Sequence, residues 1–269
     1  LEALAQFGRT RTDFAVAFGG GVTGDMAGFA AASYLRGIPF VQIPTSLLAQ
    51  VDSSVGGKTG VDLPQGKNLV GAFWQPRLVL IDPDTLNTLP PRYFADGMGE
   101  VVKYGCIRSR ALFDSLRDGQ AWERLEDIIY QCVDIKRQVV ENDERDKGER
   151  MILNFGHTLG HSLEKAYHFQ GPSHGEAVGV GMVRIVRASE AAGFTARGTA
   201  DEIVSVLQAY GLPVSDPISD QILAAGAVND KKSLNGKLNL VLLKEIGRCA
   251  VVPISQADLL PLLEGRLSL

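Results

Sequence analysis

The chain has 269 residues, of which 45% are hydrophobic and 22% charged, proportions typical of a globular protein. Its formal net charge of -4 argues against a general nucleic-acid binder, because no strongly basic face is implied. The apolar stretches are too short for a membrane span. Three widely spaced cysteines, Cys106, Cys132 and Cys249, indicate reduced thiols rather than a disulfide framework. We therefore expect a cytoplasmic protein that binds neither nucleic acid nor membrane.

The first third of the chain alternates short apolar strands with helices. Strands are predicted over residues 14–18, 40–43 and 78–81, and helices over 23–34 and up to Asp52. This alternation predicts an α/β fold with a parallel sheet. Residues 1–8 resemble the tail of a helix, so we expect the natural chain to begin earlier.

A glycine turn follows the first predicted strand. The strand leads through Gly19-Gly20-Gly21 into a helix. This arrangement directs backbone N–H groups and a helix N-terminus toward a bound phosphate. The glycines at 19, 21 and 24 fit G-x-G-x-x-G, but no acidic residue follows at the distance typical of dinucleotide-binding folds. The alternative that this is a tight turn that binds no ligand therefore remains. Asp25 either caps the helix or contacts a ribose.

A second glycine pair precedes Lys58. The segment lacks the spacing of a nucleotide triphosphate-binding loop, since Asp52 stands where the first glycine belongs. We predict a flexible loop over Gly56 and Gly57 that presents Lys58 to an anion, with Lys67 close behind. Solvated loop lysines are an equal alternative.

From Pro90 onward helical periodicity dominates. Helices are predicted over 91–108, 110–118, 121–142, 151–168, 175–193 and 199–211, and a β-hairpin over 237–243 and 249–253. We therefore predict an α/β domain over residues 1–89 and a mainly helical domain over 90–269.

All four histidines lie in one stretch of this helical part. His157 and His161 are four residues apart, hence on one helix face, and Gly171-Pro172 breaks the chain so that His174 can fold back. Glu100, one turn from Lys103, is the candidate for a missing carboxylate ligand. The pattern suits a divalent metal with a position open for substrate, and it leaves open which histidines bind. His168 has no assigned role.

Three further polar residues are candidates for the same site. Lys136, Arg150 and Asn154 share a site if the loop 141–149 folds over between two helices. Individually, each is more often a solvated group.

An ordered set of motifs covers nearly the whole chain. The motifs are Gly19–Asp25, Tyr34-Leu-Arg36-Gly-Ile-Pro, Ile43–Ser46, Val51–Lys58, Gly99–Lys103, Leu153–His161 and His174-Gly-Glu-Ala-Val178. Taken together, this set resembles the 3-dehydroquinate synthase family of sugar phosphate cyclases. The resemblance implies an NAD-binding parallel-sheet domain followed by a helical metal- and substrate-binding domain.

The resemblance also implies a role for each matching residue. Metal ligands would be Glu100, His157 and His174, which moves His161 from the metal to the substrate. NAD would be lined by Gly20, Gly21, Val22, Asp25, Thr45, Ser46, Lys58, Lys67 and Thr88. Catalytic residues would be Asp52, Lys103, Lys136, Arg150, Asn154 and His161, with Lys58, Lys232 and Arg36 binding substrate. Arg36 would reach the phosphate across the interface of a homodimer.

The implied reaction converts 3-deoxy-D-arabino-heptulosonate 7-phosphate to 3-dehydroquinate and phosphate, with NAD and Zn²⁺ or Co²⁺. Family members carry a further N-terminal portion before the glycine turn, so the resemblance implies that the NAD-binding domain lacks its first strands. Another sugar phosphate cyclase is disfavoured because Lys136, Arg150, Asn154 and His161 match a carboxylate-bearing substrate. A metal-dependent polyol dehydrogenase and a non-enzymatic fragment also stay open.

Overall fold

The structure is a computed structural model that describes residues 1–63, 66–228 and 236–269. The chain divides into two compact units, the first formed by residues 1–97 and 129–145 and the second by 98–128 and 146–269. These units differ from the predicted domains in two ways: the division falls after Gly97, and a later segment returns to the first unit. The assignment of 1–89 and 90–269 as functional domains stays a prediction.

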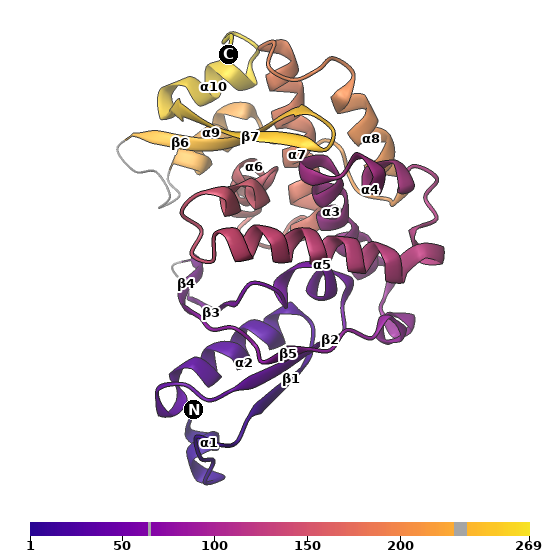
Figure 1. Cartoon of the computed structure of the whole chain (residues 1–269). Helices are drawn as coiled ribbons and strands as arrows, with labels where there is room; N and C mark the ends of the chain where they lie inside the picture. Colours follow the sequence, from indigo (N-terminus) through magenta and orange to yellow (C-terminus); the bar gives the residue numbers. More distant parts are fainter. Residues whose placement is uncertain (64–65, 229–235) are drawn as a thin grey trace. The chain divides into compact units, whose positions relative to one another are not determined.

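A small parallel sheet organises the first unit. Its strands are β1 (Ala15–Gly19), β2 (Phe40–Pro44) and β5 (Leu78–Val79), in the order β1-β2-β5. Helix α2 (Gly21–Ser33) packs along β1 and β2, as Figure 1 shows, and the short helix α1 (Glu2–Gln6) precedes the sheet. Ala31 of α2 forms a buried cluster with Ile38 and Phe40. The predicted α/β architecture is confirmed.

One face of this sheet carries exposed apolar side chains. Val16 pairs with Val41, which pairs with Leu78, so these three lie in one row across the sheet. Val16, Phe18 and Leu78 are each more than half exposed. Parallel sheets are normally covered on both faces, so this row of exposed apolar side chains is unusual.

A β-hairpin that was not predicted begins at Lys58. Strands β3 (Lys58–Leu63) and β4 (Gly66–Phe73) are antiparallel, with Lys58 opposite Phe73. The predicted loop is confined to the turn at Gly56 and Gly57, and Lys58 itself belongs to a strand. Gly56 and Gly57 adopt positive φ angles of 99° and 67°, a turn that leads directly into the strand. Lys58 is thereby held by backbone pairing at the start of β3 instead of on a free loop.

The second unit is mainly helical. Its described elements are the later part of α3 (Pro91–Arg108), α4 (Arg110–Ser115), the start of α5 (Leu125–Asn142), α6 (His157–Ala166), α7 (His174–Ala191), α8 (Thr199–Ala209), α9 (Asp220–Val228), β6 (Lys237–Glu245), β7 (Arg248–Ser255) and α10 (Leu259–Leu263). The predicted hairpin is confirmed as β6–β7, whereas α9 and α10 were not predicted. None of the helices among the described residues is long and apolar enough to cross a membrane.

Helices α6 and α7 approach closely because glycines line their contact (Figure 1). A Cβ added to Gly181 would lie 2.1 Å from the carbonyl oxygen of Gly156, an impossible distance. We expect Gly181→Ala to lower the free energy of unfolding by about 3 kcal/mol, since the helices must move apart. Gly179→Ala, on the same helix but with only ordinary contacts at 3.6 Å, is the matched control. Urea unfolding measures both, and equal stabilities would contradict this packing.

Candidate active site

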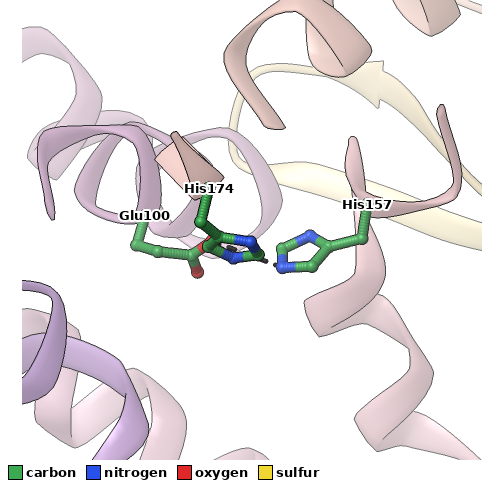
Figure 2. Close-up of side chains that lie close together, drawn as sticks. All are labelled: Glu100, His157 and His174. Atoms are coloured by element: carbon green, nitrogen blue, oxygen red, sulfur yellow. Dashed lines mark ion pairs between the residues drawn. The ribbon is translucent and has the colours of Figure 1, made fainter. Parts of the chain in front are cut away.

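Three ligand-type side chains from three elements converge in the second unit. Glu100 lies on α3, His157 begins α6 and His174 begins α7. The Oε1 atom of Glu100 lies 3.3 Å from Nε2 of His157 and 3.5 Å from Nε2 of His174. Figure 2 shows both imidazole rings turned toward the carboxylate. One ligand atom from each residue lies within 4.8 Å of the others, a spacing that suits a metal ion.

Close backbone contact brings α3 and α7 to this point. A Cβ added to Gly99 would lie 2.8 Å from both Cα and the carbonyl oxygen of Gly175. Each glycine directly neighbours a ligand-type residue, Glu100 in one case and His174 in the other. The absence of side chains at this crossing therefore allows the carboxylate and the imidazole to meet.

The charges of these groups fit a divalent cation. Glu100 is fully buried, and its Oε2 forms an ion pair with the buried Lys103. Burial opposes ionisation, yet the Lys103 ammonium and His157 hold the pKa of Glu100 well below its usual range. Among the described residues, Oε1 of this carboxylate has no hydrogen-bond partner. An anionic oxygen without a partner, facing two imidazole nitrogens, is what a metal requires of its ligands.

The two imidazoles differ in protonation. Burial lowers the pKa of His157, which favours the neutral ring that binds metals. Burial also acts to lower the pKa of His174, but the carboxylates of Glu100 and Glu164 outweigh it and raise that pKa to about 10. Without a cation, a proton on His174 thus balances the surrounding negative charge.

Other predicted residues of the second unit lie on α6 or directly before it. The ring of His161 is 5.4 Å from that of His157 and 6.1 Å from that of His174, between centroids. Arg150 and Asn154 both lie in the 3₁₀ segment Glu149–Asn154 directly before α6, where Arg150 is buried. Glu164, three residues after His161 on α6, was not predicted from the sequence, and it lies close to both His161 and His174. Its helical spacing from His161 was the signal that could have found it.

The predicted NAD residues belong to the first unit. Gly20 precedes α2 as its N-cap, and a Cβ added there would lie 3.5 Å from Oγ of Ser46. Thr45 donates its backbone N–H to the carbonyl of Gly19, so the glycine turn lies beside the end of β2. The structure therefore brings Gly20, Gly21, Thr45 and Ser46 together, with Val22 exposed in the first turn of α2. Lys67 extends from β4, and Thr88 ends the 3₁₀ segment Pro83–Thr88.

Lys136 and Asp52 form an ion pair within the first unit. Nζ of Lys136 lies 3.0 Å from Oδ1 of Asp52 and donates to its backbone carbonyl at 2.6 Å. Lys136 is buried, and the role that the family resemblance gives to both residues stays a prediction. Arg36 is exposed at the end of the 3₁₀ segment Tyr34–Arg36, and Lys232 lies outside the described residues.

Asp25 carries a perturbed carboxyl group. Burial raises its pKa to about 6, Lys136 opposes this rise, and the negative charges of Asp52 and Asp62 add to it. Because the folded state binds a proton more tightly than the unfolded chain, the stabilisation present at pH 4 is lost as pH rises through 6.

We therefore expect Asp25→Asn to stabilise the protein relative to the parent by at most about 3 kcal/mol at neutral pH, and by less near pH 4. Urea unfolding across this range measures the difference. Asp13→Asn is the control of opposite sign, because hydrogen bonds from Thr10 lower the pKa of Asp13. A stability difference independent of pH would contradict the burial of Asp25.

Known proteins share this arrangement of motifs. The family model described as 3-dehydroquinate synthase N-terminal matches residues 1–96, and the model described as 3-dehydroquinate synthase C-terminal matches residues 97–233. A 3-dehydroquinate synthase of Clostridium perfringens is 58% identical over 249 residues, which cover 91% of this chain and 71% of the relative.

Two solved structures have the same fold. One is 2-epi-5-epi-valiolone synthase from Streptomyces hygroscopicus with NAD⁺ and Zn²⁺ bound, at a TM-score of 0.88 and 28% identity over 98% of this chain and 76% of that chain. Another is 2-deoxy-scyllo-inosose synthase complexed with carbaglucose-6-phosphate, NAD⁺ and Co²⁺, at a TM-score of 0.86 and 30% identity over 97% and 76%. With both family models matched in order and a relative this similar, the chain belongs to the 3-dehydroquinate synthase family.

Proposed function

We propose that this protein is a 3-dehydroquinate synthase that converts 3-deoxy-D-arabino-heptulosonate 7-phosphate to 3-dehydroquinate and phosphate in the shikimate pathway, with NAD and a divalent metal. The observation that carries the proposal is the convergence of Glu100, His157 and His174 in a chain 58% identical to a 3-dehydroquinate synthase. Two imidazoles and one carboxylate suit Zn²⁺, and Co²⁺ accepts the same ligands.

The protein side of the chemistry follows from the site. Glu100, His157 and His174 would hold the metal. A bound divalent metal would supply Lewis acidity to a substrate hydroxyl, and NAD would supply reversible hydride acceptance at the carbon that carries this hydroxyl. His161 faces the substrate and transfers protons in the later steps. Lys103, Arg150 and Asn154 bind the anionic and hydroxyl groups of the substrate, as the family resemblance implies.

The first unit contains the residues that we propose for NAD and some of those that we propose for the substrate. The N-terminus of α2, preceded by its glycine turn, suits the pyrophosphate of NAD, because backbone N–H groups and the helix dipole point there. The rest of this proposed NAD-binding surface is formed by Asp25, Thr45, Ser46, Lys58, Lys67 and Thr88. Lys136 and Asp52 hold each other in place and position the substrate. Lys232 and Arg36 bind its phosphate.

Phosphate release without net NADH formation tests the proposal. The protein supplied with Zn²⁺, NAD and the heptulosonate phosphate should release phosphate while NADH absorbance stays constant, since the hydride returns to the substrate. A stoichiometric rise in NADH with glycerol, and no phosphate release, would instead identify a polyol dehydrogenase. Turnover of a phosphorylated sugar without a carboxylate, in preference to the heptulosonate, would identify another sugar phosphate cyclase.

We also propose a cytoplasmic homodimer. Cys106, Cys132 and Cys249 are free thiols, which is typical of a reducing compartment. Arg36 is exposed, where it is accessible to a second subunit. Light scattering of the purified protein tests the dimer, and Arg36→Ala should then raise KM for the phosphorylated substrate without weakening zinc binding.

A further inference from the structure

Glu164 is a buried carboxylate beside the proposed metal site, and the proposed function gives it no role. It lies on α6 and is only 4% exposed. A carboxylate that has lost its hydration requires hydrogen-bond donors or positive charge nearby. Ligand-type atoms of His161, Glu164 and His174 all lie within 4.8 Å of one another, so two imidazoles border this carboxylate.

The ring of His174 lies between two carboxylates. Its Nε2 is 3.5 Å from Oε1 of Glu100, and its Nδ1 is 3.6 Å from Oε1 of Glu164. A neutral imidazole donates a proton from one ring nitrogen and offers a lone pair at the other. With the N–H at Nδ1 directed toward Glu164, the lone pair at Nε2 is directed to the point where Glu100 and His157 also converge.

His157 shows the same orientation with a different partner. Its Nδ1 lies 3.1 Å from the backbone carbonyl of Phe155, which can only accept a hydrogen bond, so this nitrogen carries the proton. Its Nε2 is then the free nitrogen, 3.3 Å from Oε1 of Glu100. Both rings thus place an oxygen acceptor at Nδ1 and turn Nε2 toward Glu100. For His174 the acceptor is Glu164.

We infer that Glu164 is a positioning residue that fixes the tautomer and ring orientation of His174 for metal binding, an inference that rests on the proposed metal site. Outer carboxylates of this kind orient metal-binding histidines and strengthen them as ligands. A second metal held by Glu164 and His174 is disfavoured, because His174 would have to give up both ring protons. Glu164 therefore acts through His174, and its side chain also borders His161.

Zinc affinity, measured by competition with a chromogenic chelator, tests this role without requiring catalysis. We expect Glu164→Gln to weaken zinc binding by about tenfold, because an uncharged amide oxygen can still accept the Nδ1 proton of His174, and Glu164→Ala by about a hundredfold. Glu176→Gln is the matched control. Glu176 lies two residues after His174 but accepts from the backbone N–H of Ser173, a capping contact that glutamine preserves.

Metal stoichiometry and unfolding transitions complete the experiment. The inference requires the same single equivalent of zinc in the parent and in both Glu164 variants, with unfolding transitions that remain cooperative. Parent-like zinc affinity in Glu164→Gln and Glu164→Ala would overturn it. So would a second equivalent of zinc that is lost in these variants, which would make Glu164 a ligand. A parent protein that binds no zinc would contradict the proposed function as well. If Glu164→Ala does not fold, Glu164→Gln decides.

Discussion

Replacing His157 or His174 with alanine is expected to leave the protein without its metal and to lower the rate of phosphate release by at least about a thousandfold. Each histidine directs Nε2 at the Glu100 carboxylate, so either substitution removes one of the three proposed ligands. Lewis-acid stabilisation of developing charge is worth several kcal/mol, which corresponds to a loss of that size. Elemental analysis of the purified variants measures the metal directly.

The other two histidines provide the contrast within the same segment. His161→Ala should retain the metal and lose about 100- to 10,000-fold in rate, as expected for a proton-transfer group. His168 is exposed just beyond the end of α6, so His168→Ala should retain both metal and rate. A metal-free His161→Ala combined with a fully loaded His174→Ala would show that the ligand assignment is wrong.

The histidine cluster shows which features of the site local sequence spacing can predict and which it cannot. The spacing of His157 and His161 places both on one face of a helix, and α6 does contain both. Spacing alone does not separate a ligand from a substrate group, because the distinction depends on α3 and α7, which bring Glu100 and His174 to one side of this helix. Glu100 and the histidines are more than 50 residues apart along the chain, and here the family resemblance, not periodicity, supplied the expectation.

The helices with a clear apolar period were predicted, and the glycine-rich hairpin β3–β4 was not. The sheet strands and the helices from α3 to α8 follow clear hydrophobic patterns, whereas β3 and β4 are rich in glycine and polar residues. These strands pair through backbone hydrogen bonds after the turn at Gly56 and Gly57. Side-chain composition does not reveal such backbone pairing. Glu164 was missed for a related reason: a glutamate on a helix is ordinarily solvated, and only packing reveals its burial.

Glu100→Gln and Lys103→Met are expected to have opposite effects on zinc binding, although they disrupt the same buried ion pair. The glutamine variant removes a charged ligand and leaves the Lys103 ammonium buried without its carboxylate. Breaking a buried pair in this way costs about 3–5 kcal/mol of stability. Glu100→Gln should therefore lose zinc, activity and stability together.

Lys103→Met removes the cation and keeps the carboxylate. The carboxylate then has one positive charge fewer beside it in the metal-free protein, so a bound cation stabilises the variant more than it stabilises the parent. We expect zinc to raise the unfolding temperature of Lys103→Met by more than that of the parent, and to leave that of Glu100→Gln unchanged. The rate of phosphate release by Lys103→Met should still fall by about 100- to 1,000-fold, the usual loss when a group that stabilises developing charge is removed.

Differential scanning calorimetry with and without zinc, combined with zinc titrations, separates these cases. The comparison is informative because each variant removes one member of the same ion pair and leaves the other in place. The difference between the variants therefore separates the role of Glu100 from that of Lys103. Zinc binding by Glu100→Gln at the affinity of the parent would exclude Glu100 as a ligand. Loss of zinc in Lys103→Met would show that the ammonium holds Glu100 in position, so that the lysine supports the metal site instead of opposing the charge of the metal. If both variants behave as expected, Lys103 balances the charge of Glu100 at Oε2, and Oε1 is left for the metal.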